Sequence, residues 1–172
     1  MRTSLISIAM FIAAVSGASA QAPGPTAPPD CSGPEFHQFD FWIGEWQVTA
    51  GGSVAGSNRI EPLLDGCALA EHWTSATGGR GESLNFYDRA SGRWHQAWTD
   101  ARGQALLMSG GLFEGSMVMR TEPVTAADGT VRVHRTMWTP LPDGTVRQHW
   151  ETSTDGGVTW TTVFDGLYER QE

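Results

Sequence analysis

The sequence contains no lysine, so its 11 basic residues are all arginine, set against 19 aspartate and glutamate residues for a net charge of −8. The arginines form no basic run. Nucleic acids and anionic membrane surfaces bind clustered positive charge, so we expect neither as a partner of the mature chain. The acidic excess is more typical of solubility than of recognition.

Recognisable catalytic motifs are also absent. The chain has no G-x-S-x-G nucleophile elbow, no H-E-x-x-H helix, no phosphate-binding loop and no dinucleotide-binding glycine pattern. Two cysteines alone do not make a zinc site. We therefore expect no metal and no cofactor, and we favour a protein without catalysis, while an acid–base enzyme stays open as an alternative.

Long apolar runs are limited to residues 5–15, which follow a positively charged start. Small residues at positions 18–20 then complete the pattern of a secretory signal peptide cut after Ala20. A retained membrane anchor, the alternative, needs roughly 20 apolar residues. We therefore predict a signal peptide over residues 1–20 and a mature protein that is periplasmic or secreted.

Cysteine is scarce, with only Cys31 and Cys67 in the chain. In an oxidising compartment an even pair usually forms a disulfide, which we predict here, with two free buried thiols as the alternative. Four prolines fall within residues 21–30. We predict a disordered leader over residues 21–35, before a single domain over residues 36–172.

Turn signals containing glycine recur about every 8–12 residues in that domain, a spacing that indicates an all-β fold. A short helical turn is expected near residues 34–39. About ten strands are predicted, over residues 40–49, 54–63, 67–75, 82–88, 93–99, 104–113, 115–122, 131–139, 144–153 and 158–169. Short links favour an antiparallel meander closed into a barrel over a sandwich, because closure removes exposed strand edges.

Alternation along the strands predicts a semi-polar barrel interior, since successive strand residues point to opposite faces. In four strands the more apolar face carries one polar residue. The residues predicted to face inward are Leu69, Glu71 and Trp73; Trp94, Gln96 and Trp98; Val133, Arg135 and Met137; and Val146, Gln148 and Trp150. Other strands add Leu106, Met108, Met117 and Met119, and then Trp160, Thr162, Phe164 and Tyr168. A buried carboxylate needs a partner, and Arg135 would supply one to Glu71.

Two interpretations of the polar residues stay open. They can satisfy one another inside a filled barrel, or they can hold the polar end of a ligand whose apolar part lies among tryptophan and methionine side chains. The ligand-binding residues would then be Glu71, Trp73, Trp94, Gln96, Trp98, Arg135, Met137, Gln148 and Trp150.

A histidine stands next to each inward polar residue in the sequence: His72, His95, His134 and His149. The other residues on the histidine faces are polar, so we predict that all four imidazoles face solvent. If the faces were inverted, the imidazoles would line the interior and indicate a haem or metal site.

Residues 37–46, HQFDFWIGEW, resemble the opening signature of a family of exported bacterial proteins of unknown function. Later segments similar to the same family are residues 58–62, 64–67, 83–88, 94–100 and 147–151. The resemblance covers nearly all of the mature chain. It implies a barrel of calycin type, similar to lipocalins, fatty-acid-binding proteins and nitrobindins, and it supplies no function.

Residues 153–160, STDGGVTW, look like a single Asp-box hairpin of the kind repeated in sialidase propellers. In such a hairpin the aspartate accepts bonds from turn amides and the glycines adopt unusual φ values. We interpret this segment as a folding device rather than as a sign of glycosidase chemistry.

The function that these features favour is the binding of a small amphipathic or aromatic molecule inside an exported barrel. The alternatives are a filled barrel that contacts other proteins, a haem- or metal-binding protein, and an enzyme. In the last case burial would raise the pKa of Glu71 and let it act as a base. The sequence indicates neither the identity of the ligand nor an oligomeric state.

Overall fold

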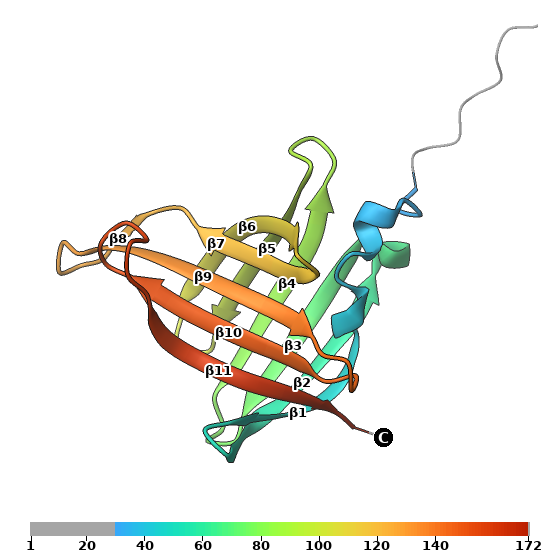
Figure 1. The fold of residues 1–172 in the computed structure, drawn as a ribbon, viewed down its shortest axis with the longest axis horizontal. Coiled ribbons are helices and arrows are strands. Elements are labelled where there is room, and N and C mark those ends of the chain that lie inside the picture. Colours follow the sequence, from blue (N-terminus) through green and yellow to red (C-terminus); the bar gives the residue numbers. More distant parts are fainter. Residues whose placement is uncertain (1–29, 172) are drawn as a thin grey trace, which may run out of the picture.

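The computed structural model describes residues 30–171, so the predicted signal peptide lies outside the described residues. Within them, ten strands form a closed antiparallel meander barrel (Figure 1). Pairing follows the chain from β1 to β7, continues through β9 and β10 to β11, and closes where β11 pairs with β1. The predicted all-β fold class is confirmed, and a calycin-like fold is consistent with this topology.

The observed strands follow the predicted segments closely. They are β1 Gly44–Ala50, β2 Ser53–Leu63, β3 Ala68–Ser75, β4 Arg80–Asp88, β5 Arg93–Asp100, β6 Ala105–Phe113, β7 Ser116–Thr121, β9 Val131–Pro140, β10 Val146–Ser153 and β11 Thr161–Arg170. A two-residue strand, β8 (Val124–Thr125), pairs with β9, and a short 3₁₀ turn, η3 (Leu64–Gly66), joins β2 to β3. The agreement arises because tight glycine turns fix the ends of most hairpins.

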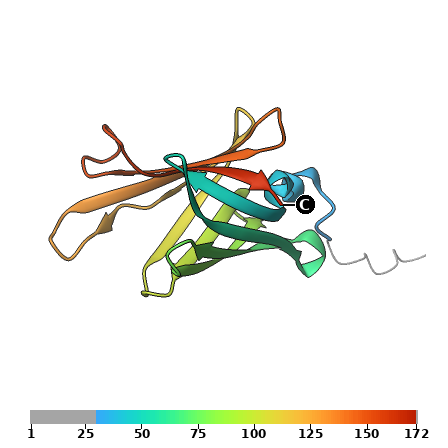
Figure 2. The ribbon, with the colours of Figure 1, turned by 90° about the horizontal axis from the view of Figure 1, so that it is seen from below.

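Two short 3₁₀ helices, η1 (Pro34–His37) and η2 (Asp40–Trp42), cover one end of the barrel. Figures 1 and 2 place them away from the β10–β11 turn. The helical turn near residues 34–39 was predicted, but the predicted start of the first strand at residue 40 is wrong. Phe39 and Trp42 stack with ring centroids 4.8 Å apart and are fully buried, so this segment plugs the barrel instead of extending β1.

Helices among residues 30–171 are all short, and none of them has the length and apolarity needed to cross a membrane.

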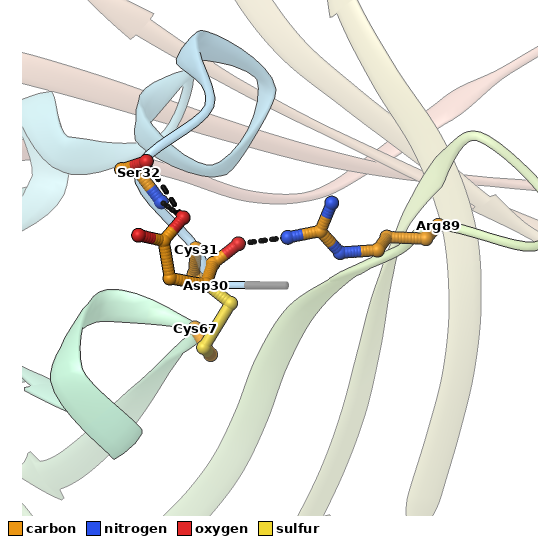
Figure 3. Close-up of a disulfide and its surroundings, with 5 residues drawn as sticks. All are labelled: Asp30, Cys31, Ser32, Cys67 and Arg89. Atoms are coloured by element: carbon orange, nitrogen blue, oxygen red, sulfur yellow. Dashed lines mark hydrogen bonds between the residues drawn. A yellow bond between two sulfur atoms is a disulfide. The ribbon is translucent and has the colours of Figure 1, made fainter. Parts of the chain in front are cut away.

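The predicted disulfide between Cys31 and Cys67 is present (Figure 3). It ties the segment before η1 to the turn between β2 and β3. The guanidinium of Arg89 also donates a hydrogen bond to the backbone carbonyl of Asp30. The described end of the predicted leader, residues 30–35, is therefore folded onto the barrel.

Candidate ligand-binding cavity

The barrel contains a half-open internal cavity with a volume of about 120 Å³. It is lined by Glu71, Trp73, Gln96, Trp98, Leu106, Met108, Thr136, Gln148, Trp150, Phe164 and Tyr168. The partly exposed aromatic residues lie near the strand ends that lead into the β3–β4, β5–β6 and β10–β11 turns. The mouth is thus at the end opposite η1 and η2.

The cavity has the size of one ring. An apolar cavity of about 150 Å³ holds benzene. A volume of about 120 Å³ therefore accepts a single aromatic ring or a short aliphatic segment. Because the cavity is open at one end, a longer molecule can extend through the mouth.

Glu71 on β3 lies at the inner end of the cavity, and only 5% of its surface is exposed. Its Oε1 accepts a hydrogen bond from Asn58 Nδ2 at 2.8 Å, and its Oε2 accepts one from Ser83 Oγ at 2.6 Å. Burial raises the pKa of Glu71 above its ordinary value of 4.5, and the two hydrogen bonds offset only part of this effect. The carboxyl group is held by neutral donors, with no ion pair among the described residues.

Two hydrogen-bonded chains extend from Glu71 around the cavity. On one side, Asn85 Nδ2 donates to Ser83 Oγ at 2.9 Å, and Gln96 Nε2 donates to Asn85 Oδ1 at 2.9 Å. On the other side, Asn58 Nδ2 also reaches the hydroxyl of Tyr168 at 3.3 Å, and that hydroxyl donates to Gln148 Oε1. Six strands, β2 to β5 together with β10 and β11, thereby share one polar floor.

Tyr168 is buried in the same network. Burial, together with the charge of Glu71, raises the pKa of the Tyr168 phenol well above its ordinary value of 10. The phenol therefore stays protonated at physiological pH, where it donates its hydrogen to Gln148.

Aromatic side chains form the walls above this floor. Trp73 and Phe164 pack edge to face with centroids 6.2 Å apart. Strand glycines make room for the rings. A Cβ at Gly81 would lie 2.9 Å from the Trp98 ring, and one at Gly166 would lie 2.4 Å from the Phe164 ring. Glycine inside a strand often marks such a close approach, and this is a signal that the sequence contains.

Six of the nine residues predicted to bind a ligand line the cavity: Glu71, Trp73, Gln96, Trp98, Gln148 and Trp150. Trp94 faces inward as predicted but lies deeper, outside the cavity lining. Its Nε1 donates to the carbonyl of Glu35 at 3.1 Å and to Gln38 Oε1 at 3.2 Å, so it anchors the plug.

The inward prediction is wrong for Val133, Arg135 and Met137, because β9 has the opposite orientation. Thr136 pairs with Trp150 and lines the cavity, whereas Arg135 pairs with Glu151 on the outer face. Arg135 Nη2 donates to Glu151 Oε2 at 2.6 Å, so the predicted pairing of Arg135 with Glu71 is also wrong.

Sequence alternation predicted the wrong inward face for β9 because part of the outer face of this strand is covered by another segment. The guanidinium of Arg135 lies 4.1 Å from the ring centroid of Trp160, which closes the Asp-box hairpin. Val133 is also buried on this outer face. In the sequence, the outward-facing residues of β9 are therefore more apolar than the inward-facing ones. Trp138, which is fully buried and inward, was the available signal for the correct face.

Three histidines face outward as predicted, and the fourth does not. His72 contacts Glu61 at 3.0 Å and Glu82 at 2.5 Å on the outer surface, and His95 and His149 lie on outer faces as well. His134 shares the inward side of β9 with Thr136, but it lies outside the cavity lining.

His134 forms a hydrogen bond with Trp150, one of the residues that line the cavity. Its Nδ1 accepts a hydrogen bond from Trp150 Nε1 at 3.2 Å, and partial burial lowers the pKa of its imidazole below 6.5. Among residues 30–171, no group of three or more His, Cys, Asp or Glu side chains is arranged to hold a metal ion.

The remaining lining residues divide into those that alternation predicts and one that it missed. Leu106, Met108, Phe164 and Tyr168 were expected inside and line the cavity. Thr136 was missed because of the inverted orientation of β9. Trp160 and Thr162 were also expected inside, and both predictions are wrong. Trp160 packs against Arg135 on the outer face, and a register shift between Trp150 and Glu151 places Thr162 opposite Glu151 on that face.

The fold and the cavity together define the class of protein: a closed ten-stranded antiparallel barrel with a half-open, semi-polar interior. The chain matches no protein-family model and no curated protein. Its interpretation therefore rests on the geometry of the barrel and its cavity.

Proposed function

We propose that this protein binds a small amphipathic molecule inside its barrel, with the apolar part of the ligand among the aromatic walls and the polar end toward Glu71. The observation that carries this proposal is the half-open cavity of about 120 Å³. Large aromatic walls with a few convergent polar groups are the usual composition of small-molecule sites. A filled barrel, the main alternative, would leave no such space.

The division of the cavity into two zones supports an amphipathic ligand over a purely apolar one. Glu71, Gln96 and Tyr168 are buried at the floor, whereas Trp98 and Trp150 are only partly buried near the mouth. A hydrocarbon would leave the remaining acceptor sites of Glu71 and Asn58 without a partner, which costs binding free energy.

A second candidate is an acid–base enzyme in which Glu71 is the base. The observation in its favour is that burial raises the pKa of this carboxyl while the cavity gives it access to a bound molecule. Turnover of a bound compound that is abolished by Glu71→Gln would favour this candidate over simple binding.

The proposal includes export. The signal-like segment over residues 1–20 and the resemblance of residues 37–46 to an exported bacterial family support a location in the periplasm or outside the cell. The bond between Cys31 and Cys67 is compatible with that oxidising setting.

Tryptophan fluorescence tests the binding function directly. The probe is 2-phenylethanol, a neutral amphipathic molecule with one ring, titrated while intrinsic fluorescence is recorded. We expect saturable quenching or a spectral shift. We also expect Trp98→Phe to reduce the change, because Trp98 lines the cavity.

Trp160→Phe is the matched control, since Trp160 packs against Arg135 on the outer face. It should leave the ligand-induced change intact. The proposal fails if single-ring amphipathic compounds cause no saturable change in the wild-type protein, or if both variants lose it equally.

A further inference from the structure

The side chains that line the cavity can supply negative charge but no positive charge. Its lining includes one carboxylate, Glu71, and no arginine or histidine, and the chain contains no lysine. The arginine predicted to neutralise Glu71 instead pairs with Glu151 on the outer face at 2.6 Å. An anionic ligand would find no counter-charge inside the barrel and would meet the Glu71 carboxyl at the floor.

The floor also presents more acceptors than free donors. Each oxygen of Glu71 accepts one protein hydrogen bond, whereas a carboxylate offers about four acceptor sites. The hydroxyl hydrogen of Tyr168 is used on Gln148, and the amide nitrogen of Gln96 is used on Asn85 and Ser83. Among the described residues, the amide nitrogen of Gln148 has no hydrogen-bond acceptor, but Asn58 Oδ1 adds a buried acceptor without a partner to those of Glu71. A ligand group that donates several hydrogen bonds therefore fits this floor better than one that accepts them.

The walls favour positive charge as well. A cation that enters through the mouth passes the aromatic rings of Trp73, Trp98 and Trp150, which attract positive charge more than negative charge. The chain carries a net charge of −8, which raises the local concentration of cations around the protein.

We infer that the ligand is an organic ammonium ion, a primary or secondary amine on an aromatic ring or short apolar group, whose N–H groups face the Glu71 carboxylate. The inference rests on the proposed binding function and narrows it to one chemical class. The volume of about 120 Å³ limits the enclosed apolar part to a single ring.

Binding of an ammonium ion to a protonated Glu71 releases a proton, and this release can be measured. Burial raises the pKa of Glu71, so the carboxyl group of the empty protein stays protonated up to a higher pH than a free carboxyl group does. Binding then proceeds as Glu71–COOH + R–NH₃⁺ → Glu71–COO⁻···⁺H₃N–R + H⁺, with the proton taken up by buffer. Affinity for the amine rises with pH through the pKa of Glu71 and falls again only when the amine itself deprotonates, near about pH 9–10.

Few other groups act on this titration. Tyr168 on β11 faces Glu71 from within the interior, and His72 on β3 and Glu82 on β4 act through the barrel wall from the outer face. The neighbouring strand β2 contributes the uncharged Asn58.

Isothermal titration calorimetry of the full mature chain with three probes tests the inference. The probes are 2-phenylethylamine, 2-phenylethanol and phenylacetate, which share a ring and a similar length but differ in charge. Near neutral pH we expect the amine to bind roughly tenfold or more tightly than the alcohol, and phenylacetate to bind least. Proton release should be visible as a binding enthalpy that changes with the ionisation enthalpy of the buffer.

Glu71→Gln and Glu169→Gln form a matched pair, because each removes one negative charge and Glu169 is exposed on the outer face of β11. We expect Glu71→Gln to abolish the amine-over-alcohol preference and the proton release, and Glu169→Gln to keep both. If Glu71→Gln fails to fold, the pH dependence and proton release of the wild-type protein decide the question.

The outcomes separate the two proposals. Equal affinity for amine and alcohol, or tightest binding of phenylacetate, overturns the ammonium inference while leaving the binding function intact. Binding of none of the three probes overturns the binding function itself.

Discussion

At the scale of single residues, the side chains that line the cavity include one carboxyl group, that of Glu71, and no basic group. Glu71 is 5% exposed and is held by Asn58 and Ser83, both of which are neutral. A lone charge in such a place is costly, and the protein lowers that cost by favouring the protonated form of the carboxyl and by hydrogen bonding.

Glu71 should therefore make stability depend on pH in a defined direction. A raised folded-state pKa means that its contribution is complete below the unfolded value of 4.5 and is lost as pH rises through the folded pKa. Glu71→Gln, which stays neutral, should remove this loss. We expect the variant to gain stability relative to the wild-type protein as pH rises, measured by urea unfolding across a pH series.

Glu169→Gln is the control in this series, because Glu169 is exposed on β11, and its stability difference from the wild-type protein should stay nearly constant with pH. If the stability difference between Glu71→Gln and the wild-type protein also stays constant with pH, this contradicts a raised pKa of Glu71 in the folded protein.

Arg135 should behave as a structural residue and not as part of the cavity. Arg135→Met leaves the carboxylate of Glu151, whose side chain is 11% exposed, without its partner. We expect a loss of roughly 1–3 kcal/mol in unfolding free energy, a figure reduced for the partial exposure of the pair. Affinity for 2-phenylethanol should be unchanged, and a large loss of affinity would contradict the outward position of Arg135.

At the scale of elements, a neighbouring hairpin covers part of the outer face of β9. The Asp-box segment over residues 153–160 folds around Asp155, whose carboxylate accepts bonds from the backbone amides of Val158 and Thr159 and from the Thr159 hydroxyl. Trp160 Nε1 donates to the carbonyl of Gly157 at 3.1 Å. The hairpin thus presents the Trp160 ring to β9.

Asp155→Asn should loosen this hairpin, because an amide cannot accept all the bonds that the carboxylate accepts. We expect faster hydrogen exchange at the amides of Val158 and Thr159, measured by NMR, while amides of β4 keep their protection. The wild-type protein should show the same loosening only at very low pH, because these bonds hold the pKa of Asp155 well below 3.8. Unchanged exchange in the variant would mean that the backbone holds the turn without the carboxylate.

At the scale of the whole molecule, closure of the barrel and its plug are tied together. The plug residue Phe39 packs edge to face against Trp94 and Trp138 at 5.7 and 5.3 Å between ring centroids. The Cys31–Cys67 bond holds the chain just before the plug against the β2–β3 turn (Figure 3). This arrangement closes one end of the barrel and leaves the other open to a ligand.

The double variant Cys31→Ser/Cys67→Ser tests this tether. Its cross-link spans 36 residues in sequence. Loop-closure entropy then predicts a loss of about 3–4 kcal/mol in unfolding free energy, measured by urea denaturation. The single-ring cavity lies at the other end, so ligand affinity in the folded variant should change little.

Reduction of the wild-type protein with a thiol reductant should reproduce the loss of stability. A reduced protein as stable as the oxidised one would show that packing of Phe39 and Trp42 holds the plug without the tether.

Local patterns in the chain were enough to predict the fold class, most strand boundaries and much of the cavity. Glycine turns and alternation are local, and they place Glu71, Gln96 and Gln148 inside because one face of each of their strands is clearly more polar. Cys31 and Cys67 were paired correctly because the chain offers no other combination.

The orientation of β9, the partners of Glu71 and the size of the cavity could not be predicted from local patterns. Each depends on segments far apart in the chain: the hairpin ending at Trp160 covers one face of β9, and this makes alternation within β9 ambiguous. The volume left inside depends on how rings from several strands fit against glycines such as Gly81 and Gly166, which no single segment encodes.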